Sequence, residues 1–214
     1  MPFIASILPV VLYILVVYEL DNFSLISVKR LLVLVGCGMV SALLCFGLFY
    51  ALDSILSSSQ TDFVYPVLEE AMKAIPLLYL ARHKKMVFFI DSVICGAAVG
   101  GGFSILENIF YLVLGEPMGM GTVLFRGLEV ALIHMGCSAI VAAGLMFAVR
   151  MAERRRSRLE VKRKDVLMAV FLLVAAPALH VSTIPSTLFL CFSTLWSSAP
   201  WPASWSGPTS TMQI

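Results

Sequence analysis

Charged side chains are scarce in this sequence. Of its 214 residues, 13% are charged and 60% are apolar. A soluble domain of this length has too little interior to bury so much apolar surface, so the composition excludes an ordinary soluble globular protein. Lipid is the solvent that suits this chain, and the sequence predicts an integral membrane protein.

The apolar runs also lack the strand-like alternation of polar and apolar residues. Crossing about 30 Å of hydrocarbon takes roughly 20 apolar residues in a helix. Six stretches satisfy this requirement, at about 3–20, 31–52, 64–81, 86–112, 121–149 and 166–192. Continuous runs favour helices over a transmembrane barrel. We therefore predict an all-α, polytopic membrane helix bundle with about six transmembrane helices.

The bundle is predicted to form a single domain over residues 1–192. The first run has no basic segment ahead of it and no small-residue cleavage site after it, which favours a retained helix over a removed signal peptide. Residues 193–214 are rich in Ser, Pro and Trp and contain no charged residue. We expect this tail to be poorly ordered.

Lysine and arginine are absent from the loops near residues 53–63 and 113–120. The basic residues lie in the other three loops, at Lys29 and Arg30, at Arg82, Lys84 and Lys85, and between 150 and 164. By the positive-inside rule these three loops are cytoplasmic and both termini lie outside the cell membrane. We interpret the run 150–164 as a headgroup anchor. The net charge of +2 therefore indicates no nucleic-acid partner.

Metal-binding CxxC spacing is absent as well. All five cysteines lie inside apolar runs, at Cys37, Cys45, Cys95, Cys137 and Cys191. We interpret them as small core residues and not as a disulfide framework. Four glycines, at Gly96, Gly100, Gly101 and Gly102, include a GxxxG pair. We expect them to permit close helix packing without a chemical role.

Against this apolar background, a few ionisable residues lie inside the predicted spans. They are Glu69, Glu70, Lys73, Asp91, Glu107, Arg126, Glu129, His134 and His180. A charged group at the centre of a membrane helix costs about 2.5–3.5 kcal/mol even on the lenient insertion scale. This set therefore requires compensation, either by pairing or by a functional site.

Helical spacing predicts two sets of ion pairs. Lys73 can meet Glu69 at i,i+4 or Glu70 at i,i+3, and Arg126 can meet Glu129 at i,i+3. We expect the second pair to be structural. Lys73, however, can neutralise only one of the three carboxylates near it. The surplus carboxylates in a low-dielectric site would bind protons or a metal.

The depths of these residues favour one shared cavity. At 1.5 Å per residue, the glutamates of the third and fourth runs and the histidines of the fifth and sixth can all contribute to a polar cavity in the outer half of the membrane. Asp91 lies near the cytoplasmic end of its run, so we expect it to be interfacial and separate from this set.

Four motifs occur in order on successive predicted helices. Residues 69–73 read Glu-Glu-Ala-Met-Lys, which matches EExxK, and residues 103–108 match FxxxEN. Isolated histidines follow at His134 and His180. Over about residues 60–185 the chain resembles the PrsW family of intramembrane proteases, distant relatives of the CAAX-processing and bacteriocin-immunity membrane proteases.

The resemblance implies a membrane-embedded peptidase that cuts a single-pass membrane protein, with an anti-sigma factor as the substrate of some relatives. It implies as catalytic residues Glu69, Glu70, Glu107, His134 and His180, with Lys73 and Asn108 in support. If a metal such as zinc is present, its expected ligands are Glu70, Glu107, His134 and His180.

Two mechanisms use these residue types. A buried carboxylate can deprotonate water while the histidines stabilise the oxyanion or protonate the amine. Alternatively, Glu and His from three helices can ligate Zn²⁺. The absence of HExxH, and of a cysteine in the set, favours the metal-free mechanism. Because adjacent helix residues diverge by about 100°, one of Glu69 and Glu70 should face the water while the other orients it or pairs with Lys73.

Two further functions remain open from the residues alone. A rhomboid-like serine protease would use Ser138, in the degraded GxSG of residues 136–139, with His180 as base. An ion- or proton-coupled transporter would use the buried Glu, Lys and His as a relay. The transporter hypothesis predicts repeated halves, which the sequence lacks.

Overall fold

The computed structural model describes residues 1–19, 26–52, 55–115, 118–157 and 163–183. These form six helices: α1 (Pro2–Glu19), α2 (Val28–Leu52), α3 (Ser58–Arg82), α4 (Phe89–Leu114), α5 (Met120–Arg156) and α6 (Arg163–Thr183). The predicted all-α class is confirmed. The end of the sixth predicted span, the tail at 193–214 and Cys191 lie outside the described residues.

Polar groups at the helix ends fix where α3 and α4 begin. The backbone N–H of Ser57 donates to Gln60 Oε1 at 3.0 Å, which closes the first turn of α3. Asp91 Oδ2 accepts from the backbone N–H groups of Val87 and Phe88 at 2.9 Å. Asp91 therefore satisfies otherwise unpaired donors at the start of α4, and no described contact joins it to the other buried carboxylates.

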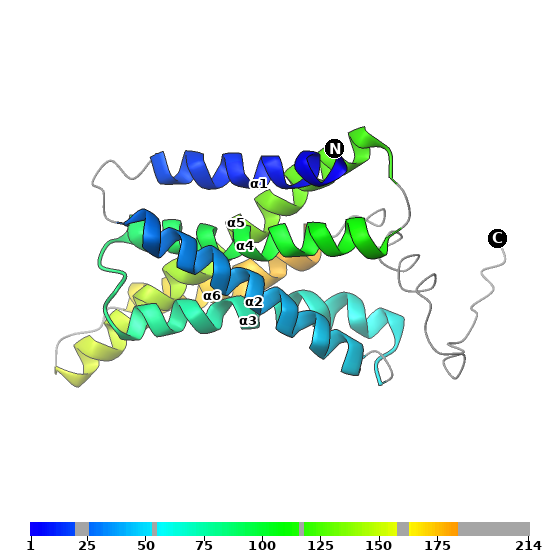
Figure 1. Cartoon of the computed structure of the whole chain (residues 1–214). Coiled ribbons are helices and arrows are strands. Elements are labelled where there is room, and N and C mark those ends of the chain that lie inside the picture. The colour runs from blue at the N-terminus through cyan, green and yellow to red at the C-terminus, as the bar shows by residue number, and fades with distance from the viewer. Residues whose placement is uncertain (20–25, 53–54, 116–117, 158–162, 184–214) are drawn as a thin grey trace.

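α4 lies in the middle of the bundle, between α2 and α5, with α1 packed across α4 and α5 (Figure 1). Glycine allows this close approach. A Cβ at Gly100 would overlap the backbone of His134 on α5, and one at Gly102 would overlap the backbone of Val35 on α2. Small residues at helix crossings are the usual means of close packing in membranes. Here they bring α4 against the helix that carries His134.

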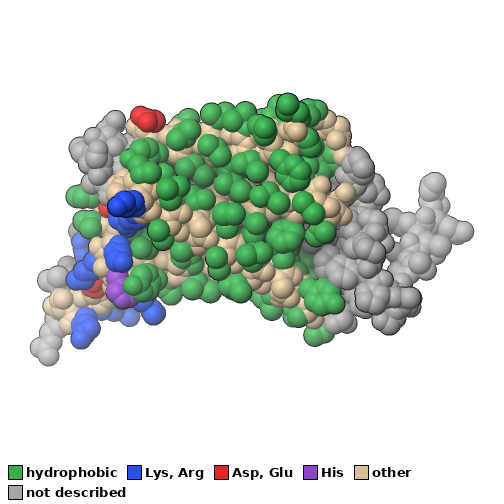
Figure 2. Space-filling model, viewed as in Figure 1, with side chains coloured by type: hydrophobic (Ala, Val, Ile, Leu, Met, Phe, Trp, Pro, Cys, Tyr) green, Lys and Arg blue, Asp and Glu red, His purple; other side chains and the backbone are tan. Residues whose placement is uncertain are grey.

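The face of the molecule shown in Figure 2 is a wide apolar band with basic side chains gathered at its left end. Contacts from the segment between α3 and α4 place the start of α2 and the end of α5 beside it at this end. Arg30 donates to the backbone carbonyl of Lys85, and Lys84 pairs with Glu153 at 3.3 Å. This is the charge distribution that the positive-inside rule requires of a membrane protein. Which side of the membrane this end faces remains a prediction.

Four of the described helices, α1, α2, α4 and α5, are long and apolar enough to cross a membrane. The other two are still part of the bundle. α3 carries the charged side chains of the EExxK motif, and the apolar part of α6 is shorter, at Val166–His180. Both helices pack against α5. The chain is a multi-pass membrane protein in which the less apolar α3 brings polar side chains into the interior.

Candidate active site

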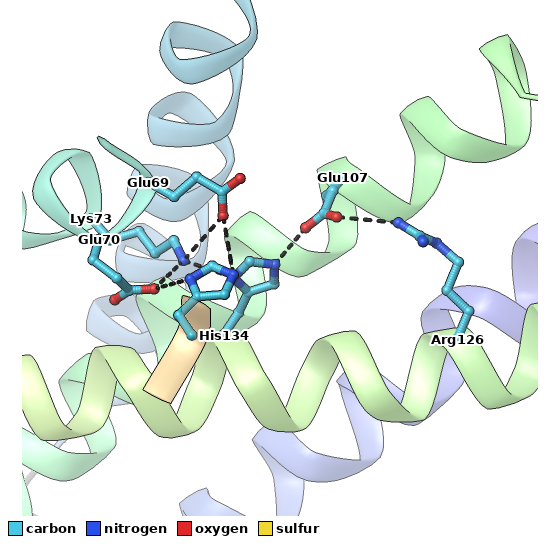
Figure 3. A network of polar contacts seen from close by, with 7 residues as sticks. Glu69, Glu70, Lys73, Glu107, Arg126 and His134 are labelled. Carbon is cyan, nitrogen blue, oxygen red and sulfur yellow. Dashed lines mark hydrogen bonds and ion pairs between the residues drawn. The ribbon is translucent and has the colours of Figure 1, made fainter. Parts of the chain in front are cut away.

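Polar side chains from four helices meet inside the bundle (Figure 3). α3 contributes Glu69, Glu70 and Lys73, α4 contributes Glu107, α5 contributes His134, and α6 contributes His180. All five residues predicted to be catalytic, together with Lys73, therefore lie in one connected cluster. Most of the cluster is buried, but Glu69 and Glu107 keep side-chain exposures of 15% and 14%.

The two glutamates of α3 have different surroundings, as their angular separation predicts. Glu70 Oε1 accepts from the Lys73 ammonium at 2.7 Å, and both side chains are buried. Glu69 Oε2 lies 3.9 Å from the same ammonium, too far for a hydrogen bond. The predicted pairing of Lys73 is thus made closely with Glu70 and loosely with Glu69.

Each histidine holds a carboxylate at one ring nitrogen and faces Glu69 with the other. His134 Nε2 lies 2.5 Å from Glu107 Oε2, and His180 Nδ1 lies 3.1 Å from Glu70 Oε1. The opposite nitrogens, His134 Nδ1 and His180 Nε2, lie 3.9 and 3.6 Å from Glu69 Oε2. Carboxylates only accept when ionised, so His134 donates from Nε2 and His180 donates from Nδ1. The nitrogens facing Glu69 are therefore the acceptors.

Glu69, His134 and His180 form a possible metal-binding group. One ligand atom from each lies within 4.8 Å of the other two. Glu69 Oε2 is buried and has no hydrogen-bond partner among the described residues. Zinc binds nitrogen and oxygen at about 2.0–2.2 Å, so tetrahedral ligands lie about 3.3–3.6 Å apart. The observed separations from Glu69 Oε2, 3.6 Å to His180 Nε2 and 3.9 Å to His134 Nδ1, lie at and just above the top of this range, and the three ligand atoms suit a divalent ion.

A cation, the Lys73 ammonium, already lies beside these possible metal-ligand atoms. Lys73 Nζ is 2.7 Å from His134 Nδ1 and 4.2 Å from the centre of the Phe103 ring, which also lies against His134. An ammonium has only donors, so it must donate to His134 Nδ1, in agreement with the tautomer inferred above. The pocket therefore favours positive charge, and a metal bound to Nδ1 would require Lys73 to move while it keeps its bond to Glu70.

The predicted ion pair between Arg126 and Glu129 is wrong. Arg126 Nη2 instead donates to Glu107 Oε1 on α4 at 3.2 Å, and its guanidinium lies 3.4 Å from the centre of the Tyr111 ring. Arg126 is buried, while Glu129 is half-buried. Local i,i+3 spacing could not reveal a partner on the neighbouring helix.

Asn108 and Ser138 lie apart from the cluster in their described contacts. Asn108 is buried, and neither of its side-chain polar atoms has a partner in the part of the chain that the structure describes. The supporting role expected of Asn108 remains a prediction. Ser138 Oγ is buried and forms no hydrogen bond to a described residue, His180 included. The rhomboid-like hypothesis requires that bond, so the geometry disfavours it.

A known protein family matches most of this chain. The chain matches the family described as PrsW family intramembrane metalloprotease over residues 27–183, which is more than half of its length. No curated protein and no solved structure matches the chain. The matched segment contains every residue of the polar cluster and leaves α1 outside. The chain belongs to the PrsW family of intramembrane metalloproteases and is a membrane-embedded peptidase.

Proposed function

We propose that this peptidase is metal-dependent, with Glu69, His134 and His180 as the metal ligands and zinc as the ion. Glu70 and Glu107 would orient the histidines from outside the ligand set. This differs from the ligands expected from the sequence, which included Glu70 and Glu107 and omitted Glu69. It also departs from the metal-free mechanism that the missing HExxH motif favoured, because three separate helices can supply the ligands without a local motif.

One observation carries the proposal. A buried, unpartnered carboxylate oxygen, Glu69 Oε2, faces the acceptor nitrogens of two histidines. Lys73 Nζ donates to His134 Nδ1 but lies 3.9 Å from Glu69 Oε2, and a buried carboxylate oxygen without a hydrogen bond is costly. A divalent ion satisfies all three acceptors at once.

The carboxylates behind the histidines support the same division of roles. Metal-binding histidines usually donate their other ring N–H to a carboxylate or carbonyl, which fixes the tautomer and the ring orientation. Glu107 takes this position behind His134, and Glu70 takes it behind His180. Neither carboxylate is needed as a ligand, and each leaves the correct nitrogen toward Glu69.

The chemistry follows from the ion and from the groups around it. A zinc ion supplies Lewis-acid activation of water and of the scissile carbonyl. Glu70 Oε2 has no hydrogen-bond partner among the described residues, so it can take a proton while Oε1 keeps Lys73 and His180 in place. The Lys73 ammonium would then stabilise the negative charge that develops on the carbonyl oxygen. Glu70 returns the proton to the leaving amine.

The proposed substrate is a single-pass membrane protein, with a membrane-anchored anti-sigma factor as one candidate from the family resemblance. We place the chain in the cell membrane with the basic end in the cytoplasm and both termini outside. The partial exposure of Glu69 and Glu107 gives water a route to the cluster.

The test uses detergent-purified, monodisperse protein and a single-pass reporter substrate. Metal content and cleavage rate are measured for the wild type, for Glu69→Gln and for Glu129→Gln, a matched control whose carboxylate lies outside the cluster. We expect stoichiometric zinc and activity in the wild type and control, loss of both in Glu69→Gln, and loss by chelation that zinc reverses. Full cleavage by metal-free wild type, or by Glu69→Gln, would contradict the proposal.

A further inference from the structure

We infer that Arg126 is a positioning residue, which holds Glu107 in the orientation that presents His134 to the metal. The inference rests on the proposed function, because it concerns the same metal site. It assigns a role to a buried arginine that lies outside all four of the motifs identified in the sequence.

The Glu107 carboxylate is divided between two partners on one helix. Oε1 accepts from Arg126 at 3.2 Å, and Oε2 accepts from His134. Arg126 and His134 lie about two turns, or about 12 Å, apart along α5. Glu107 extends from α4 between them, as Figure 3 shows. With both oxygens engaged, the plane of the carboxylate is fixed.

Arg126 is itself held by neighbouring helices. Its guanidinium lies over the Tyr111 ring of α4, and the next residue, Gly127, lies against the backbone of Ser6 on α1. A Cβ at Gly127 would come within 2.6 Å of the Ser6 carbonyl oxygen. Contact with the aromatic face restricts the guanidinium, and the close backbone packing holds this part of α5 against α1.

Without Arg126, the Glu107 carboxylate would be free to rotate. The terminal torsion of a glutamate has a broad energy well, so a carboxylate held at only one oxygen can rotate. Rotation would weaken the bond from His134 Nε2 and release the ring. Loss of a group that orients a metal-binding histidine typically lowers metal affinity by about 10–100-fold.

A structural role alone would predict a different result. If Arg126 served only to neutralise buried charge, its removal would lower the amount of folded protein while folded molecules kept normal metal affinity. If it positions Glu107, the folded protein itself must bind metal more weakly. Affinity per folded molecule therefore separates the two roles.

The experiment measures Zn²⁺ affinity of folded, metal-depleted protein by competition with a chromogenic chelator, together with the visible spectrum of Co²⁺-loaded protein. We compare the wild type with Arg126→Gln, Arg126→Lys and the control Arg150→Gln, an exposed arginine of α5. We expect Arg126→Gln to lose about 10–100-fold in affinity and to change the Co²⁺ spectrum. Arg126→Lys should recover part of the loss, and Arg150→Gln should match the wild type.

A double variant keeps the test valid if Arg126→Gln folds poorly. Arg126→Gln combined with Glu107→Gln removes both charges of the pair, and its metal affinity should equal that of Glu107→Gln alone. A further loss in the double variant would overturn the inference, as would wild-type affinity and spectrum in folded Arg126→Gln. If the wild type binds no metal, the proposed function fails and this inference fails with it. If the wild type binds metal and folded Arg126→Gln binds it equally well, this inference alone fails.

Discussion

Replacing Gly100 by alanine is expected to force α4 away from α5 at the level of His134. A Cβ at this position would lie 2.6 Å from the carbonyl carbon of His134 and 2.8 Å from Cα of Met135. These are backbone atoms, so no side-chain rotation relieves the overlap. The helices must separate, and His134 moves with its backbone.

Two opposing effects determine how much Gly100→Ala changes the free energy of unfolding. Overpacking typically costs about 1–3 kcal/mol, and overlap with backbone places Gly100→Ala at the upper end. Alanine recovers about 0.5–1 kcal/mol through its lower conformational entropy in the unfolded chain. We therefore expect a net loss of about 2 kcal/mol in the free energy of unfolding. Cleavage should fall by about 100-fold, because a displacement near 1 Å at a catalytic group has that effect.

Two other glycines provide matched controls. A Cβ at Gly136, also on α5, would meet nothing within 4 Å, so Gly136→Ala should retain activity and unfold no more easily than the wild type. A Cβ at Gly101 would meet the side chain of Ile14 at 2.8 Å, which can rotate, so Gly101→Ala should be intermediate. Unfolding in detergent and cleavage per folded molecule are the measurements. Wild-type stability in Gly100→Ala would refute the contact between α4 and α5.

Three further outcomes are expected. Lys73→Met should destabilise the fold by about 3–5 kcal/mol, because it leaves buried carboxylates without their cation, whereas Lys84→Met, at an exposed ion pair, should cost less than about 1 kcal/mol in the same unfolding assay. Ser138→Ala should cleave the reporter substrate at close to the wild-type rate, and complete loss in folded protein would revive the serine-protease mechanism. A membrane-impermeant thiol reagent applied to intact cells should label a cysteine replacing Ile55 and not one replacing Ser157; the reverse pattern would invert the topology.

The helices were predictable because each apolar run is long and continuous, but their ends were less so. The third predicted span began near residue 64, whereas α3 begins at Ser58, and the fifth ended near 149, whereas α5 ends at Arg156. Hydropathy marks the part of a helix that lies in hydrocarbon. Hydrogen bonding continues into residues such as glutamate and arginine, which are good helix formers in water.

The residues that form the site were predictable from the sequence for a different reason. A glutamate, lysine or histidine in an apolar span is conspicuous because it is costly there. The division of roles was not predictable, because it depends on which nitrogen of each histidine faces Glu69. Sequence spacing established that Glu69 and Glu70 point in different directions, but only the positions of α5 and α6 decide which of the two faces both rings.

Arg126 illustrates how a local rule fails at a helix contact. The i,i+3 spacing to Glu129 is worth only about 0.2–0.5 kcal/mol on an isolated helix. Glu107, on the adjacent helix and partly shielded from water, offers a stronger electrostatic interaction because the effective dielectric is lower there. The partner on α4 therefore displaces the nearer one in sequence, and no pattern within α5 records this.

The glycines of α4 show that packing and chemistry are not separate properties of this chain. From the sequence they were expected to serve close packing alone. Gly100 does so, but the backbone it meets is that of His134. A side chain there would widen the α4–α5 spacing, and the bond between Glu107 on α4 and His134 on α5 would lengthen by a similar amount. Because hydrogen bonds weaken steeply beyond about 3.2 Å, close helix packing is a condition for the orientation of this histidine.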